Sequence, residues 1–395
     1  MELETFLGSS RYTVGWVFQK LKDSDEGFRK LAENGISKVE EKNLSGIGYL
    51  SIIIRLTFYF GGNSDKNDND KTFKVICKLP TIDMIYKNFK RSSENNRHTN
   101  HTNNHKNDEL TEFLTKAHNR ECFVYSSIVS NLGIKVPKIF FTEEKNVEND
   151  GCILMEDISD NGSLQNVLKE INYQQVETVI KNIAKMHAKS QTLPQKFFET
   201  IKFDNEIKVP KDCLRGLFKL DSKIIQKYKI ELEEIWGKSA IVDSHLKYGI
   251  PPVVSHGDCW INNIFFYKNE TGKASNKFYT LLDWQLTHRG NGLNDIARFL
   301  TVSVEADLLE KHRNDFLQIY CNSFNEKCAE INLSNSYDID LVQEMFKEQS
   351  KSELTFSLAI LFNFYAHSKD SIETRERILK RIEEAVKFCF SESNE

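Results

Sequence analysis

The feature that most limits the fold is a short β segment inside a half of the chain that is otherwise helical in pattern. Beyond about residue 155, apolar residues recur at helical spacing, as in residues 176–186. Residues 264–267 and 278–282 break this pattern, because they are rich in β-branched and aromatic residues and are joined by the turn-rich sequence KNETGKASN. The sequence therefore predicts one β hairpin held among helices.

Polar residues stand on both sides of this hairpin. Asp258 and Asn263 precede the first strand, five positions apart, and Asp283 follows the second strand. A hairpin brings the two outer ends of its strands together, so we expect the three side chains to converge. Carboxylate and amide oxygens are ligands that Mg²⁺ prefers, and a carboxylate can deprotonate an attacking hydroxyl in phosphoryl transfer. We assign Asp258 as the base, and Asn263 and Asp283 as Mg²⁺ ligands. The alternative is a surface hairpin with incidental acids.

Residues around this trio have expected supporting roles. His256 is expected to fix the loop backbone through a hydrogen bond. Asp295 either begins a helix or holds the loop that carries Asp258 (the base loop), and we expect a structural role. His187, at the end of an amphipathic helix, is expected to be a core histidine with its hydrogen bonds satisfied. Trp260 either packs beneath the base loop or touches the acceptor, and Gln285 either supports the metal or packs in its loop.

The N-terminal part contains a candidate nucleotide-binding pair. Residues 50–60 and 73–79 read as two antiparallel strands, and Lys78 lies near the end of the second. Residues 110–131 read as a helix that contains Glu121. A strand lysine held by a helix glutamate can bind the α- and β-phosphates of a nucleotide. The alternative is a purely structural or solvated pair.

Two further segments are candidate nucleotide contacts. The turn before the first strand contains Gly46 and Gly48, whose backbone N–H groups can cover phosphates. The extended segment with Met155, Glu156 and Ile158 joins the two halves of the chain and can offer backbone groups to the adenine edge. For the glycines, an ordinary turn is the alternative.

The pattern along the chain predicts an α+β protein with two lobes. Residues 1–155 form a small N-lobe, with helices over residues 1–40 followed by short strands, and residues 156–395 form a mostly helical C-lobe. A polar insert near residues 88–108 contains His98 and two further histidines, and we interpret it as a mobile, solvated loop rather than a metal site.

Composition excludes several classes of protein. The net charge is −4, from 53 basic and 57 acidic residues, so no electrostatic case exists for nucleic acid as a partner. No apolar run reaches the ~20 residues that span a bilayer. The N-terminus lacks a signal-peptide pattern, and the 8 cysteines form no CxxC pair. We expect a cytoplasmic protein without a membrane span.

Several segments together resemble one family. HGDCWINN, LLDWQ, ILMEDIS, VICKLP and IAKMHAKS are similar to motifs of the ecdysteroid kinase-like (CHK kinase-like) family, within the aminoglycoside and choline phosphotransferase branch of the protein-kinase-like superfamily. This resemblance covers nearly the whole chain, residues 35–390. It implies a bilobal protein-kinase-like fold, and ATP-dependent phosphorylation of a hydroxyl on a small molecule such as an ecdysteroid or a foreign compound.

The acceptor is expected to bind among the C-lobe helices, roughly residues 210–250 and 300–370. Aromatic residues there suit an apolar, ring-containing alcohol better than a polycation. The aromatic residues are Phe218, Trp236, Phe299, Tyr320, Phe324, Phe362 and Phe364. Two alternatives stay open: a choline-, ethanolamine- or aminoglycoside-type phosphotransferase, and a catalytically inactive kinase fold that only binds.

Overall fold

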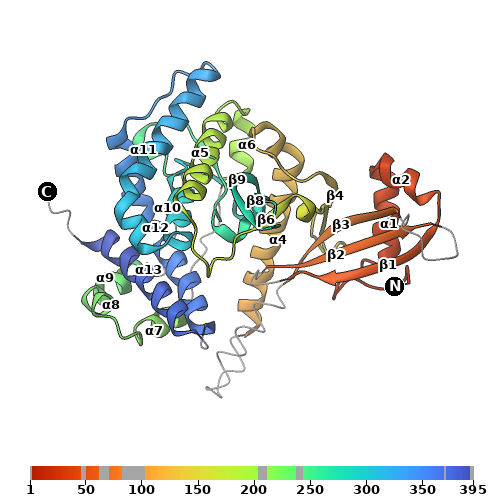
Figure 1. Cartoon of the computed structure of the whole chain (residues 1–395), viewed down its shortest axis with the longest axis horizontal. Coiled ribbons are helices and arrows are strands. Elements are labelled where there is room, and N and C mark those ends of the chain that lie inside the picture. The colour runs from red at the N-terminus through yellow and green to blue at the C-terminus, as the bar shows by residue number, and fades with distance from the viewer. Residues whose placement is uncertain are drawn as a thin grey trace. The chain divides into compact units, whose positions relative to one another are not determined.

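The chain folds into two compact units in a computed structural model. The structure describes residues 2–45, 50–61, 71–81, 103–202, 211–236, 243–368 and 371–391, with backbone only for residues 103–107 and 211–213. One unit comprises Met1–Ser127 and Pro137–Asp160, and the other comprises Ile128–Val136 and Asn161–Glu395. The first is rich in strands and the second is mostly helical, so the predicted α+β class is confirmed (Figure 1).

The first unit is built on a five-stranded sheet in the order β1-β2-β3-β5-β4, and every neighbouring pair is antiparallel. The predicted pair, β2 and β3, matches along its whole length, from Ser51 opposite Pro80 to Phe60 opposite Lys71. The strands are β1 Ile36–Asn43, β2 Ser51–Phe60, β3 Lys71–Pro80, β4 Ile139–Glu143 and β5 Cys152–Glu156. The long β2–β3 ladder fixes the register of Lys78 in the sheet.

Strand β1 is a correction to the sequence analysis, which extended the N-terminal helices to residue 40. Its sequence, ISKVEEKN, is charged, and only Val39 is buried. Strand β1 lies at one edge of the sheet. Charged residues are common on edge strands because they discourage pairing with another chain. The usual alternation of apolar and polar residues is therefore too weak here to reveal a strand.

Two N-terminal helices cover one face of the sheet. The side chain of Thr13 caps α1 (Val14–Ser24), and that of Asp25 caps α2 (Glu26–Ala32). Phe28 of α2 packs edge-on against Phe58 of β2, with ring centroids 5.3 Å apart. These helices and the alternate residues of the strands form the core of the unit.

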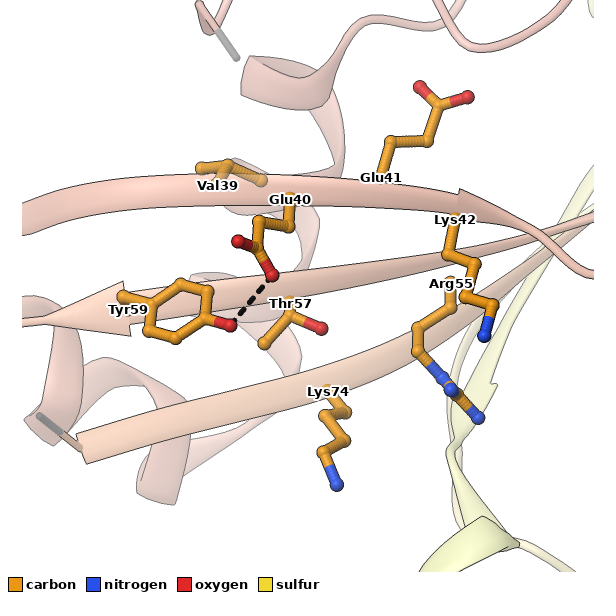
Figure 2. A pocket seen from close by; sticks show the side chains of 8 residues that line it. All are labelled: Val39, Glu40, Glu41, Lys42, Arg55, Thr57, Tyr59 and Lys74. Carbon is orange, nitrogen blue, oxygen red and sulfur yellow. Dashed lines mark hydrogen bonds between the residues drawn. The ribbon is translucent and has the colours of Figure 1, made fainter.

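The opposite face of the sheet carries Lys78. In β3, Val75 and Cys77 point into the core, so Lys74, Ile76 and Lys78 point to the other face. A shallow hollow of about 640 Å³ lies on this face, farther along the strands (Figure 2). It is lined by Val39, Glu40, Glu41, Lys42, Arg55, Thr57, Tyr59 and Lys74. The helix that carries Glu121, α4 (Asn103–Ser127), follows later in the chain.

The second unit surrounds the predicted β hairpin with helices. The hairpin strands β8 and β9 pair antiparallel and β6 joins them, while β7 pairs with β10 in a separate two-stranded sheet. The strands are β6 Gly162–Leu164, β7 Val253–Ser255, β8 Ile264–Lys268, β9 Ala274–Leu281 and β10 His288–Gly290. The helices are α5 Tyr173–Ser190, α6 Gln195–Thr200, α7 Lys211–Leu217, α8 Lys223–Lys227, α9 Lys229–Ile235, α10 Leu293–Ser303, α11 Ala306–Glu330, α12 Ile339–His367 and α13 Ile372–Phe390.

The mostly helical pattern predicted beyond residue 155 is confirmed, and α10 and α12 pack against each other (Figure 1). Among the described residues, no helix combines the length and hydropathy needed to cross a membrane.

Candidate active site

The loop after β7 has a backbone that only glycine accommodates well. Gly257 has a φ of +81°, in the left-handed region. A Cβ atom at this position would lie 2.1 Å from the carbonyl oxygen of Leu286, which is far inside van der Waals contact. The His-Gly-Asp sequence thus lets the loop turn tightly and present Asp258.

A buried carboxylate holds this loop from below. Asp295, in the first turn of α10, accepts hydrogen bonds from the backbone N–H groups of His256 (2.7 Å) and Gly257 (2.8 Å). His187 Nε2 lies 3.1 Å from the same carboxylate, and Tyr320 Oη lies 3.0 Å from His187 Nδ1. Burial by itself would raise the pKa of Asp295, but these hydrogen bonds and charges hold the pKa below its ordinary value. Asp295 therefore anchors the loop, which is one of the two roles expected for it.

His256 connects the loop to the end of the hairpin. Its Nε2 donates to the carbonyl oxygen of Leu282 (3.0 Å), and its Nδ1 accepts from the backbone N–H of Asp258 (3.2 Å). Burial lowers the pKa of this histidine, so the ring is neutral and one nitrogen can accept. The expected role of fixing the loop backbone is confirmed.

Three donors fix the carboxylate of Asp258. Arg298 Nη1 donates to Oδ1 (2.8 Å), while Asn263 Nδ2 (3.0 Å) and Trp260 Nε1 (3.3 Å) donate to Oδ2. The side chain remains 16% exposed, so an external group can reach it. A carboxylate has about four lone-pair positions, and three donors leave room for one more hydrogen bond.

Asn263 and Asp283 are brought together by the hairpin. The backbone N–H of Leu282 donates to the carbonyl oxygen of Asn263 (2.9 Å), which places Asp283 directly after this contact. Asp283 adopts a left-handed backbone conformation (φ 71°, ψ 66°), which is uncommon outside glycine and occurs at functional sites. Gln285 Nε2 donates to Asp283 Oδ2 (3.3 Å). Asn263 therefore contacts Asp258, and Asp283 follows the residue that bonds to Asn263, while the convergence of all three side chains on a metal stays a prediction.

Sequence reasoning missed two members of this cluster, Arg298 and Glu353. Arg298, on α10, bonds to Glu353 on α12 as well as to Asp258, through Nε at 2.8 Å and through Nη2. Both side chains are about 5% exposed. Burial alone would lower the pKa of Arg298, but the two carboxylates raise it, while burial raises the pKa of Glu353. The only signal in the sequence is a charged residue within an apolar helix stretch, as in DIARFL and SELTF.

The first unit contains the predicted lysine–glutamate pair. Lys78 Nζ lies 2.6 Å from Glu121 Oε2, and the two side chains are 7% and 1% exposed. In the sheet, Lys78 stands between Ile53 of β2 and Ile153 of β5. A buried lysine needs such a partner to stay charged. The pair is formed, and its role toward a nucleotide stays a prediction.

The structure describes the segment with Met155, Glu156 and Ile158, which was predicted to contact the adenine edge. Met155 and Glu156 end β5, and Ile158 begins a short 3-10 turn. The backbone N–H of Glu156 already donates to the carbonyl oxygen of Lys138 (2.8 Å). The role of this segment stays a prediction.

Two predicted features lie outside the described residues, wholly or in part. Gly46 and Gly48 lie outside, as do His98 and His101, and no side chain is described for His105. Within the described part of the chain, no group of three or more His, Cys, Asp or Glu residues is arranged to hold a metal. A metal at Asn263 and Asp283 would therefore need ligands from a bound molecule or water, as Mg²⁺ often has.

The chain shares sequence with part of a longer curated protein. This protein of Caenorhabditis elegans, named uncharacterized oxidoreductase dhs-27, is 23% identical over 338 residues. The alignment covers 82% of this chain but only 39% of that longer protein.

Solved structures of low sequence identity also align with the chain. The GDP complex of an aminoglycoside 2'-phosphotransferase is 11% identical, with 93% of this chain and 98% of that one covered and a TM-score of 0.46. Plasmodium vivax ethanolamine kinase is 12% identical, with 97% of this chain and 90% of that one covered and a TM-score of 0.41.

The sequence profile of the ecdysteroid kinase-like family matches residues 45–333, which is well over half of the chain and includes Lys78, Asp258, Asn263 and Asp283. The chain belongs to the ecdysteroid kinase-like family.

Proposed function

We propose that the chain transfers the γ-phosphate of ATP to a hydroxyl group of a small molecule, with Mg²⁺ as the metal. The observation that carries this proposal is the fixed carboxylate of Asp258, which is bonded to Asn263 at the start of the hairpin that leads to Asp283. Phosphoryl transfer depends mainly on positioning and charge stabilisation, and an oriented carboxylate with nearby oxygen ligands supplies both.

Asp258 is the general base in this proposal. Its carboxylate accepts the proton of the acceptor hydroxyl as the hydroxyl oxygen forms a bond to the γ-phosphorus. The bond between that phosphorus and the bridging oxygen breaks, and ADP leaves with the electron pair. Arg298 occupies one lone pair of Oδ1, and Asn263 and Trp260 bind Oδ2. The carboxylate therefore keeps one orientation while it accepts the proton.

The donor atoms at Asn263 and Asp283 fit a hard cation. The amide nitrogen of Asn263 donates to both the backbone and the side chain of Asp258, so the amide oxygen is the atom left to bind a metal. Asp283 adds a carboxylate. Oxygen ligands suit Mg²⁺, which when bound neutralises phosphate charge during transfer. We assign Asn263 and Asp283 as its protein ligands.

Nucleotide binding is assigned to the first unit. Lys78, kept in place by Glu121, is assigned to the α- and β-phosphates. Met155, Glu156 and Ile158 are assigned to the adenine edge, and Gly46 and Gly48 to the phosphates, on the strength of the family resemblance alone.

The surroundings of Asp258 favour a neutral, ring-containing alcohol such as an ecdysteroid. Trp260, which binds the base, packs against Phe364 of α12 with ring centroids 6.0 Å apart. The carboxylate of Glu353 is paired with Arg298 and cannot attract a cationic acceptor strongly. Both rings are buried, at 8% and 4% exposed, and they give the base an apolar surrounding, which suits an apolar ring better than a cation.

A phosphotransfer screen tests the proposal. The purified chain, Mg²⁺ and ATP labelled in the γ-phosphate are incubated with ecdysteroids, plant phenolic glycosides, choline, ethanolamine and aminoglycosides. Label is expected on a steroid or another apolar alcohol, and the Asp258→Asn variant serves as the matched inactive control. Label on choline, ethanolamine or an aminoglycoside would replace the apolar acceptor with a cationic one. Binding of ATP with no labelled product from any compound would instead identify a binding protein.

A further inference from the structure

Arg298 links two carboxylates that belong to different parts of the second unit. Nη1 binds Asp258 in the loop, while Nε and Nη2 bind Glu353 in α12. The guanidinium also lies over the ring of Phe356, 5.1 Å from its centroid. All three nitrogens of the planar guanidinium are therefore used, and a lysine cannot reproduce this geometry because its charge is a single point.

Helix α12 presents a polar stripe within its buried surface. Gln349, Glu353 and Ser357 follow at intervals of four residues, and Ser350 lies beside them. Each is at most 5% exposed. Gln349 Nε2, Ser350 Oγ and Ser357 Oγ are buried without a hydrogen-bond partner among the described residues. Buried polar atoms of this kind normally have a partner, so the stripe is not ordinary apolar packing and Glu353 is its one charged member.

We propose that Arg298 and Glu353 are positioning residues for Asp258, so that α12 completes the catalytic centre through them. Helix α12 spans Ile339–His367 and thus lies beyond residues 45–333, the part that the family profile matches. This inference rests on the proposed function, because it concerns the geometry of the same base. It gives a role to helix α12, which lies outside the residues that the family profile matches.

The reason for a positioning role is geometric. Asn263 and Trp260 both bind Oδ2, so Arg298 is the described donor that fixes Oδ1 and sets the rotation of the carboxylate. Glu353 in turn fixes Arg298 through two nitrogens. A small misplacement of a reacting group can lower a rate about 100-fold.

The kinetic test uses conservative variants. Arg298→Lys keeps the positive charge but loses the planar guanidinium group. Glu353→Gln keeps the size of the side chain but loses its negative charge. We expect kcat to fall about 100-fold in Arg298→Lys and about tenfold in Glu353→Gln, with the KM for ATP unchanged. Glu353→Asp, which restores the charge, should recover part of the loss in kcat. A KM for ATP that rises in step with the loss, or normal turnover in both main variants, would overturn the proposal.

A second ion pair of the same type provides the matched control. Arg313 of α11 binds Glu384 of α13 and lies over the ring of Phe388, 4.0 Å from its centroid. It makes no contact with Asp258 that the structure describes. Arg313→Lys and Glu384→Gln should lower thermal stability in a similar way and leave kcat unchanged. If these controls lose kcat to the same extent, the effect of Arg298 is one of stability alone.

A spectroscopic readout separates this inference from the proposed function. The indole N–H signal of Trp260, assigned with Trp260→Phe, reports the bond to Asp258 without any need for turnover. We expect Arg298→Lys to shift this signal and speed its exchange with solvent, while Arg313→Lys leaves it in place. An unchanged signal in Arg298→Lys overturns the positioning role even if the wild type is active. If Arg298→Lys shifts the signal but the wild-type chain transfers no phosphate, the proposed function is refuted and the link between Arg298 and Asp258 is retained. Glu353→Gln provides the same measurement if Arg298→Lys fails to fold.

Discussion

Two buried ion clusters, one in each compact unit, differ in how they share charge. Lys78 and Glu121 form a pair of one cation and one anion, both nearly inaccessible. Arg298 is shared between Glu353, which is buried, and Asp258, which stays partly exposed. The first arrangement fixes the position of an ammonium group and shields it from solvent. The second leaves one carboxylate oriented and reachable, which a base requires. Under the proposed function, the first cluster binds the nucleotide and the second carries out the chemistry.

The largest expected effect separates chemistry from binding. Asp258→Asn removes the base while the amide can keep a hydrogen bond to Arg298. We expect kcat to fall by about 10³-fold, because general base catalysis contributes about 10²–10⁴-fold. The affinity for ATP, measured by calorimetric titration, should stay as in the wild type. Normal turnover by Asp258→Asn would remove the proposed difference between the clusters.

Lys78→Met should weaken ATP binding about 10- to 100-fold, since a hydrogen bond to a charged group contributes about 1.5–3 kcal/mol. The same change leaves Glu121 buried without its cation, at a cost of about 3–5 kcal/mol in the free energy of unfolding. The double variant Lys78→Met with Glu121→Leu should recover stability but not ATP binding. Thermal melts and nucleotide titrations check the two effects separately. If the double variant recovers both stability and ATP binding, then Lys78 and Glu121 form a purely structural pair.

Asp295→Asn tests the anchor beneath the loop. The wild-type carboxylate accepts from two backbone N–H groups and contacts His187, so we expect a loss of about 1.5–3 kcal/mol in the free energy of unfolding. The pKa of Asp295 is lowered in the folded chain, despite burial, by hydrogen bonds and charges. The contribution of the ionised Asp295 to the free energy of unfolding is therefore complete above the pKa of the unfolded chain, about 3.9. It is lost as the pH falls through the lower pKa of the folded chain. Urea unfolding should show a constant difference between variant and wild type at neutral pH that shrinks in acid. A difference that grows in acid would contradict this assignment.

The sequence predicted those site residues that stand in recognisable strand, hairpin or helix segments. The hairpin predicted that Asn263 and Asp283 lie near each other. Lys78 and Glu121 were paired because a strand lysine and a helix glutamate match the pair used in phosphoryl transfer, not because their spacing brings them together. Arg298 and Glu353 escaped prediction because they are 55 residues apart and meet only when α10 packs on α12. Strand β1 escaped because its charged residues hide the period of a strand. These failures follow from tertiary packing, which a single sequence does not display.

The smallest expected effect concerns the hollow on the sheet of the first unit, which lies on the same face as Lys78. Tyr59 donates to Glu40 across this hollow (2.7 Å, Figure 2), and Lys38 also binds Glu40. Exposed pairs of this kind contribute about 0–1 kcal/mol. Tyr59→Phe should therefore change the free energy of unfolding by less than about 1 kcal/mol and leave the KM for ATP unchanged. A clear rise in that KM would extend the nucleotide site from Lys78 along the sheet, because the hydroxyl of Tyr59 would then contribute to binding rather than to a solvated surface pair.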